Sequence, residues 1–306
     1  MDIEQAAGLC EQVIDHVAER VLDKHSQIRL ALSCLLARGH LLIEDLPGMG
    51  KTTLSHALAE SLSLSFNRIQ FTSDLLPADI TGVSVYRSDQ QKFEFHPGPI
   101  FKQLLLADEI NRASPKTQSA LLEAMAEQQV TVDGQTYPLP NPFFVIATQN
   151  PAEQAGTHPL PESQLDRFMM RISLGYPSPQ HEVSMLKQGV QKQPQLAACI
   201  SLTQLAQMQQ MVEQVHASDA LLNYLIKLVH HSRTSEQFRH PLSPRASWAL
   251  LQAGKAYALT AGRNYLTADD LQAVFTSVCE HRLAGSQPYN KVLLSQTLLQ
   301  AIDPVA

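Results

Sequence analysis

The pattern of hydrophobic and polar positions divides the chain of 306 residues into two parts. After helical periodicity over 3–38, the first part alternates helical segments with segments of strand length, at 41–44, 66–71, 104–108, 143–148 and 169–174. The segment 66–71 alternates loosely between apolar and polar residues, whereas 41–44, 104–108 and 143–148 are mainly apolar. The alternation of helices and strands predicts an α/β fold with a parallel sheet between helices. Beyond a Gly/Pro-rich linker at 175–179, helical periodicity continues at about 180–190, 201–215, 218–233, 244–260 and 267–281. We therefore expect a core domain over residues 1–176 and a small all-α domain over 177–306.

Two segments of the core depart from this alternation and predict hairpins. The first, at about 80–98, has two short alternating runs separated by polar turn residues. Phe93 and Phe95 lie on one face of its second strand, and we expect both to pack onto the domain. The second hairpin, at about 128–139, turns at an Asp-Gly pair.

A stretch after the first strand has the composition of a phosphate-binding loop. Glycines let backbone N–H groups approach phosphate oxygens, and the helix that follows adds its unpaired N-terminal donors. The pattern G-x-x-x-x-G-K-[ST] is met at Gly50, Lys51 and Thr52, whereas Asp45 replaces its first glycine. Lys51 is expected on the β- and γ-phosphates and Thr52 on Mg²⁺. The candidate nucleotide-binding residues of the loop are Asp45, Pro47, Gly48, Met49, Gly50, Lys51, Thr52 and Thr53.

Polar residues at two further strand ends supply the other parts of a nucleotide site. Without them, a capped helix that carries Gly-Lys-Thr by chance stays open as an alternative to the phosphate-binding loop. Asp108 and Glu109 end the apolar run 104–108, and Asn150 follows the run 143–148. Because the carboxyl ends of parallel strands share one edge, all three are expected near the loop. There Asp108 can hold Mg²⁺, Glu109 can polarise the attacking water, and Asn150 can orient that water.

Composition excludes several classes of protein. Hydrophobic residues make up 44% and charged residues 17% of the chain, which is ordinary for a globular protein. The net charge of −6 argues against a general nucleic-acid surface. The four cysteines form no C-x-x-C pair, so no zinc site is expected. Neither a secretory leader nor a membrane-spanning run is evident, and we expect a cytoplasmic protein with no membrane insertion.

Four motifs in order resemble those of the MoxR-type AAA+ ATPases, which belong to the helix-2-insert clade. They are EDLPGMGKT at 44–52, LADEINR at 106–112, ATQNP at 147–151 and LPESQLDRF at 160–168. The resemblance runs from about Val21 to the last helices, and the aspartate in place of the first loop glycine is a usage that the family shares.

The resemblance assigns roles to residues of this chain. Lys51 and Thr52 correspond to the Walker A pair, Asp108 and Glu109 to the Walker B pair, and Asn150 to sensor 1. Arg245 resembles the sensor 2 arginine, which a lid domain would bring onto the nucleotide of the phosphate loop. Arg167 resembles the arginine finger that acts on the ATP of a neighbouring subunit, with Arg112 and Arg171 as alternatives. The two hairpins resemble the helix-2 insert and the pre-sensor-1 hairpin, which deliver motion to a client.

The resemblance implies an ATPase that uses ATP and Mg²⁺, works as a homo-oligomeric ring, a hexamer, and remodels, matures or activates a protein client. Clients of this family carry a von Willebrand factor A domain. A magnesium-chelatase-like motor subunit is the alternative. A nucleic-acid motor is disfavoured because the hairpin 128–137 contains no Lys or Arg and the chain shows no appended DNA-binding module. A nucleotide switch that hardly hydrolyses ATP is disfavoured by the presence of Glu109 and Arg167.

Overall fold

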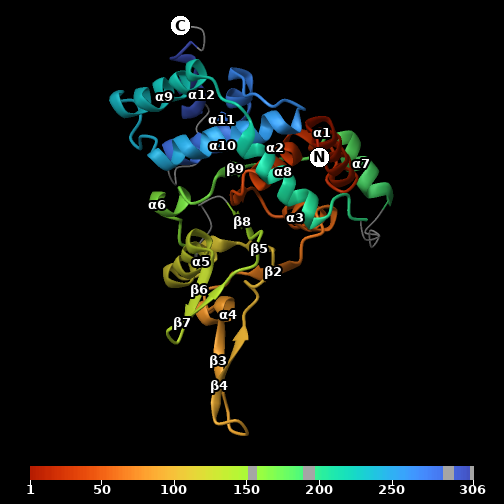
Figure 1. Ribbon diagram of the computed structural model, residues 1–306, viewed down its shortest axis with the longest axis vertical. Helices are drawn as coiled ribbons and strands as arrows, with labels where there is room; N and C mark the ends of the chain where they lie inside the picture. Colours follow the sequence, from red (N-terminus) through yellow and green to blue (C-terminus); the bar gives the residue numbers. More distant parts are fainter. Residues whose placement is uncertain (151–156, 189–196, 285–292, 304–306) are drawn as a thin grey trace.

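A five-stranded parallel sheet forms the centre of the molecule. The computed structural model describes residues 1–150, 157–188, 197–284 and 293–303 (Figure 1). The sheet has the order β2-β5-β8-β1-β9, and every pairing in it is parallel. Its strands are β1 (Leu41–Glu44), β2 (Phe66–Gln70), β5 (Leu104–Asp108), β8 (Phe144–Gln149) and β9 (Met170–Ile172). The predicted α/β fold is confirmed. Because the strands run the same way, the sheet has one amino edge and one carboxyl edge.

Alternate residues of the strands face two separate hydrophobic cores. In β5, Leu104 and Leu106 belong to one core, whereas Leu105 and Ala107 belong to the other. The first core is covered by α1 (Ile3–Ala18), α2 (His25–Leu36) and α3 (Lys51–Ser61). The second is covered by α5 (Pro115–Glu127) with the short helices α4 (Pro77–Thr81), η1 (Ile110–Arg112) and α6 (Glu162–Leu165). Burial on both faces explains the continuous apolar runs of these strands.

The C-terminal helices extend the first core. They are α7 (Pro179–Gln188), α8 (Leu202–Gln214), α9 (Asp219–Thr234), α10 (Pro244–Thr260), α11 (Ala268–Ala284) and α12 (Leu294–Gln300). Buried side chains of α8 to α12 join those of α1 and α2 in one apolar cluster. Figure 1 shows these helices grouped with α1 and α2 at one end of the molecule. Within the described residues, no helix combines the length and the apolar character needed to cross a bilayer.

Two hairpins lie at the other end of the molecule. One consists of β3 (Gly82–Arg87) and β4 (Lys92–Pro97), which extend away from the body (Figure 1). The other consists of β6 (Gln129–Val132) and β7 (Gln135–Pro138). The ring of Phe95 stacks on that of Tyr137 with centroids 4.0 Å apart and an angle of 17° between the planes. This stack joins the two hairpins.

The two phenylalanines of β4 do not behave alike. Phe95 packs as expected, but Phe93 is 71% exposed, and its aromatic contact is with Tyr86 across the hairpin. The expectation that Phe93 packs onto the domain is wrong, because the hairpin extends beyond the surface that Phe93 would cover. Val83, Val85 and Tyr86 are also exposed.

Backbone crowding fixes the root of the β3–β4 hairpin. A Cβ atom on Gly98 would lie 2.2 Å from the carbonyl oxygen of Ile80 and 2.5 Å from the nitrogen of Gly82. Gly82 itself has φ +100°, in the region that favours glycine. The two strands can therefore leave the domain side by side only if both positions lack a side chain.

We expect Gly98→Ala to destabilise the protein by about 1–3 kcal/mol, because backbone atoms must move to admit the methyl group. Faster amide exchange should be confined to the region around 80–98. The matched control is Gly8→Ala, an exposed position inside α1 where no atom lies within 4 Å of the added Cβ. That change should stabilise the protein by up to about 1 kcal/mol. If the unfolding midpoints of both variants shift in the same direction, backbone crowding at Gly98 does not explain the glycine there.

His40 joins three elements at the amino edge of the sheet. Its Nδ1 accepts a hydrogen bond from the backbone N–H of Val145 at 3.1 Å, and its Nε2 lies 3.3 Å from the carbonyl oxygen of Met125. These partners require the neutral ring with the proton on Nε2. Burial lowers the pKa of His40 to about 4, although the bond to the Met125 carbonyl acts in the opposite direction.

Because His40 is neutral in the folded protein, we expect the folded state to lose stability between pH 6.5 and pH 4. Since the folded pKa lies below the ordinary value of 6.5, the unfolded chain binds the proton first, and stability falls as the pH decreases through this interval. The loss amounts to roughly 3 kcal/mol at the lower limit. The variant His40→Asn keeps an acceptor for the N–H of Val145 but has no group that titrates in this range. The free energy of unfolding of this variant should therefore fall less steeply as the pH decreases. The variant His230→Asn, at an exposed position, controls for the loss of a histidine. Parallel pH curves for wild type and His40→Asn would refute this role.

Candidate active site

The loop between β1 and α3 has the backbone conformation that its glycines predict. Gly48 has φ +84° and Gly50 has φ +83°, and no atom lies within 4 Å of a Cβ built at either position. The glycines are therefore required by conformation and not by crowding. Helix α3 begins at Lys51 directly after Gly50, which has no side chain to cap it. The helix N-terminus thus faces the carboxyl edge of the sheet as an anion-binding end.

Lys51 connects the loop to the end of β8. Its Nζ donates to the carbonyl oxygen of Asp45 at 2.7 Å and to Oδ1 of Asn150 at 3.1 Å. Burial lowers the pKa of Lys51, while the carboxylates of Asp45, Asp108, Glu109 and Glu44 act in the opposite direction. Three of these carboxylates, those of Asp108, Glu109 and Glu44, are themselves paired with arginines. The ammonium of Lys51 at a helix N-terminus therefore remains suited to bind a polyanion.

Asp108 ends β5 beside this lysine. Its Oδ1 accepts a hydrogen bond from the hydroxyl of Thr148 at 2.5 Å, and its Oδ2 accepts from Nη2 of Arg68 at 2.6 Å. Thr148 comes from β8 and Arg68 from β2, the two strands that flank β5. The carboxylate is thus oriented by both neighbouring strands.

Glu109 lies at the turn after β5 with φ +56°. One carboxylate oxygen accepts a hydrogen bond from Nδ2 of Asn150 at 3.0 Å. The other accepts from Nε2 of Gln70 at 2.9 Å and pairs with Nε of Arg112 at 2.9 Å. The sequence-based reasoning missed Gln70, although its position at the end of β2 could have identified it by the rule that located Asp108.

The donor set fits a magnesium nucleotide. In the part of the chain that the structure describes, no group of three or more His, Cys, Asp or Glu side chains is arranged to hold a metal. Mg²⁺ does not need such a group, because one or two protein oxygens together with substrate phosphates suffice. Thr52, in the first turn of α3, and Asp108 are the residues that would hold it.

Asp45, which stands where the loop pattern has its first glycine, connects the loop to the residues that follow β9. Its carboxylate accepts hydrogen bonds from the backbone N–H groups of Leu174 and Gly175 and from the hydroxyl of Ser173, the last at 3.1 Å. These groups follow β9, so the side chain fastens the loop to the strand at the edge of the sheet. Its backbone carbonyl holds Lys51, as described above.

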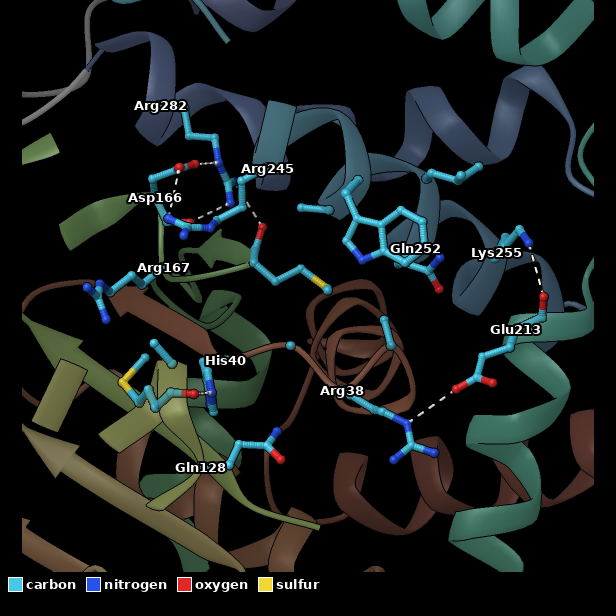
Figure 2. A pocket seen from close by; sticks show the side chains of 18 residues that line it. Arg38, His40, Gln128, Asp166, Arg167, Glu213, Arg245, Gln252, Lys255 and Arg282 are labelled. Carbon is cyan, nitrogen blue, oxygen red and sulfur yellow. Dashed lines mark hydrogen bonds and ion pairs between the residues drawn. The ribbon is translucent and has the colours of Figure 1, made fainter. Parts of the chain in front are cut away.

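The structure places Arg167 and Arg245 at the opposite edge of the sheet. Arg167 precedes β9 by three residues, and β9 pairs in parallel with β1, so Arg167 lies at the amino edge. Both arginines line a pocket of about 710 Å³ that also includes Arg38 and His40, which precede β1 (Figure 2). Between the two edges, β9 and β1 span about 10–13 Å at 3.3 Å per residue. The structure does not bring Arg245 to the phosphate loop of its own chain.

Asp166 organises this second cluster. Figure 2 shows its carboxylate between Arg245 and Arg282. It accepts from Nε of Arg282 at 2.7 Å, from Nη1 of Arg245 at 3.4 Å and from the hydroxyl of Ser243, the N-cap of α10. The same Arg282 also donates to the carbonyl oxygens of Asp166, Phe168 and Met169. Asp166 therefore joins α10 and α11 to the segment that carries Arg167.

The other two arginines considered as fingers are bound within their own chain. Arg112 pairs with Glu109, and Arg171 is buried and pairs with Glu44 at 2.8 Å. The guanidinium of Arg167 donates to the carbonyl oxygen of Leu122 at 2.6 Å and has no carboxylate partner among the described residues. Of the three, Arg167 is the one whose charge is not already neutralised.

A parallel α/β core with this loop and these strand-end acids, followed by a helical domain, defines an AAA+ ATPase. The family described as ATPase family associated with various cellular activities (AAA) matches residues 40–170, and the AAA lid domain family matches residues 230–302.

Relatives agree over nearly the whole chain. The protein is 46% identical over 282 residues to YeaC of Bacillus subtilis, described as uncharacterized, with 92% of this chain and 88% of that protein covered. It is 39% identical to the chaperone MoxR1 of Mycobacterium tuberculosis, with coverages of 89% and 75%. A crystal structure of a protein from Cytophaga hutchinsonii has a TM-score of 0.89 at 35% identity, covering 98% of this chain and 96% of that one. The chain belongs to the MoxR-type AAA+ ATPases and is an ATP-hydrolysing enzyme.

The contacts of Asp166 predict unequal losses of stability. Asp166→Asn leaves the guanidinium of Arg282, 4% exposed, without its carboxylate, and we expect a loss of about 3 kcal/mol or more. Arg245→Ala removes a side chain that is 60% exposed, and we expect less than about 1 kcal/mol. Denaturant midpoints measure both. Equal losses would mean that Arg282 does not depend on Asp166.

Proposed function

We propose that the chain hydrolyses Mg²⁺-ATP at the interfaces of a homo-oligomeric ring, a hexamer, and uses this cycle to remodel or activate a protein client. The observation that supports the proposal is the separation of the catalytic groups. Lys51, Glu109 and Asn150 lie at the carboxyl edge of the sheet, whereas Arg167 and Arg245 lie at the amino edge. A complete site therefore requires the carboxyl edge of one copy against the amino edge of the next.

Each group has a role that follows from its chemistry. Lys51 binds the β- and γ-phosphates, and the loop N–H groups cradle them. Glu109 accepts a proton from the attacking water, which Asn150 holds in line. Thr52 and Asp108 would hold Mg²⁺, which would supply positive charge against the charge that develops on the phosphates. Arg167 of the adjacent copy stabilises the transition state, an effect worth about 10³–10⁵ in rate.

We also propose that Arg245 acts on the neighbouring nucleotide and not on its own. It lies at the N-terminus of α10, linked through Asp166 to the segment of Arg167. The two arginines then engage the same phosphates, so binding of ATP by one copy orients the helical domain of the next.

The β3–β4 hairpin is the element proposed to contact the client. Its side chains Val83, Val85, Tyr86 and Phe93 are exposed at the end of the molecule farthest from the C-terminal helices (Figure 1). The stack of Phe95 on Tyr137 couples this hairpin to β6–β7. The relative MoxR1 is named a chaperone, which supports a protein client, and family resemblance favours one with a von Willebrand factor A domain. A nucleic-acid client is disfavoured by the net charge of −6.

Mixing of inactive variants tests the trans arrangement. Glu109→Gln and Arg167→Ala should each hydrolyse ATP very slowly when alone. When the two variants are mixed in equal amounts, rings assemble at random from both. About a quarter of the interfaces then combine an intact Glu109 with an intact Arg167 from the next copy. About a quarter of the wild-type rate should therefore return.

Lys51→Ala mixed with Glu109→Gln is the matched control. Lys51 and Glu109 of one site both come from the same copy. Every site in the mixed ring therefore lacks either an intact Lys51 or an intact Glu109, and no activity should return. Absence of recovery with Arg167→Ala, under conditions in which rings form, would refute a finger supplied by the neighbour.

A further inference from the structure

A small pocket lies where β6 meets α4 and α5, on the hairpin side of the molecule (Figure 1). Its volume is about 210 Å³, and its lining includes Pro77 of α4, Glu123 and Glu127 of α5, and Val130 of β6. Sites for small molecules occupy about 300–1,000 Å³. This pocket is therefore too small for a ligand of that kind, and its size suits a single long side chain.

Two carboxylates line this pocket without a cation to neutralise them. Glu123 and Glu127 are four residues apart on α5, so they lie on one side of the helix. Both are exposed, and neither forms an ion pair within the described residues. No described lysine, arginine or histidine lines the pocket with them. Since like charges at this spacing repel each other, a cation that binds between them is stabilised.

The strand β6 has a free edge at the same pocket. It pairs only with β7, and the two strands form a sheet of their own. Gln129 lies opposite Pro138, which has no N–H to donate, whereas the N–H of Leu139 donates to the carbonyl oxygen of Gln128 at 3.0 Å. Gln128 therefore belongs to a hydrogen-bonded pair, and the backbone groups of Gln129 and Thr131 point away from β7.

This edge is open to a further strand. Gln129 and Thr131 both line the pocket, and within the described residues no backbone group outside the hairpin bonds to either of them. A row of unpaired N–H and carbonyl groups is a template on which an extended segment adds as a strand. Because the pocket lies beside this edge, a long side chain of the added segment can reach Glu123 and Glu127.

We propose that the free edge of β6, together with Glu123 and Glu127, binds an extended segment of the protein client that carries lysine or arginine. We call these residues the β6 edge site. The inference rests on the proposed function, since it names the kind of client segment that this end of the molecule takes. The segment pairs through its backbone with Gln129 and Thr131, and one of its cationic side chains enters the pocket. The carboxylates repel nucleic acid and anionic lipid, so neither is the occupant.

Helix α5 connects the β6 edge site to the turn that carries Glu109. The helix follows η1 closely, and the side chain of Gln118 on α5 donates to the carbonyl oxygens of Ile110 and Ala113, each at 3.2 Å. Glu123 lies farther along the same helix. A segment bound at the site is thus held by an element whose other end is fastened to the catalytic turn.

A labelled peptide of about eight residues that alternates lysine and threonine tests the site. Fluorescence anisotropy measures its binding to the wild-type chain with ADP and again with a non-hydrolysable ATP analogue. We expect saturable binding in at least one of these states. The same peptide with glutamate in place of lysine should not bind. Methylation of alternate backbone nitrogens should weaken binding about tenfold or more, because the ladder with β6 is lost. Failure of the lysine peptide to bind in both states would overturn the proposal.

Neutral substitutions test the two carboxylates. The double variant Glu123→Gln/Glu127→Gln should bind the lysine peptide about fivefold more weakly, since each exposed ion pair contributes modestly and two are lost. The double variant Asp15→Asn/Glu236→Gln removes the same charge at exposed positions outside the pocket and should bind like wild type. Equal affinity of the two double variants would refute the site.

Proline substitutions test the strand edge. Thr131→Pro removes an N–H that points away from β7, so the hairpin should stay folded while the affinity for the lysine peptide falls about tenfold or more. Thr136→Pro is the matched control, because Thr136 lies directly opposite Thr131 and its N–H points to the other edge of the hairpin. If both variants bind the peptide equally well, the free edge of β6 is not where the peptide pairs, and the proposal fails.

Complementation separates this inference from the proposed function. Glu123→Gln/Glu127→Gln keeps every catalytic residue and should hydrolyse ATP like wild type. If the lysine peptide binds at the β6 edge site but Glu109→Gln and Arg167→Ala fail to complement, the site stands and the trans finger falls. If complementation succeeds while the lysine peptide does not bind, the β6 edge site falls alone.

Discussion

The parallel direction of the five strands is the constraint on which the rest of the structure depends. It collects the ends of β1, β2, β5 and β8 at one edge, where Gln70 bonds Glu109 and Lys51 bonds Asn150. The same constraint sends the segment before β9 to the other edge, so Arg167 cannot approach the nucleotide of its own chain. A sheet with β9 antiparallel would place that arginine beside its own phosphate loop. Strand direction, and not the length of any side chain, thus separates the two groups of residues within one chain.

The helical domain participates in this division because it is attached to the amino edge. Its buried residues share one apolar cluster with α1 and α2, and His281 and Arg282 on α11 reach the carbonyl oxygens of Phe168 and Met169. The residues joined by Asp166 therefore belong to a packed region at the amino edge.

Much of the carboxyl edge could be predicted from the sequence because each part is signalled locally. An apolar run followed by Asp108 and Glu109 identifies a buried strand end, and parallel topology then assembles the separate strand ends. Arg245 could not be located in this way, since its position depends on which face of the sheet the C-terminal helices cover, a matter of long-range packing. The same holds for Asp45, whose carboxylate accepts hydrogen bonds from backbone groups more than 120 residues away. Phe93 was misjudged because alternation predicts a face of a strand but not what lies opposite that face.

The contacts of the carboxyl edge indicate what the nucleotide must displace. Lys51 donates to the carbonyl oxygen of Asp45 and to the side-chain amide of Asn150. Asp108 accepts from the guanidinium of Arg68 and the hydroxyl of Thr148. Glu109 accepts from the side-chain amides of Asn150 and Gln70 and pairs with Arg112. Each charged group is thereby satisfied within one chain, which limits the cost of burying a lysine among carboxylates. A triphosphate that draws Lys51 away releases Oδ1 of Asn150, and the same asparagine bonds Glu109 through its Nδ2. Asn150 thus contacts Lys51 and Glu109 through the two ends of one amide, so a change at the lysine can reach the glutamate through a single side chain.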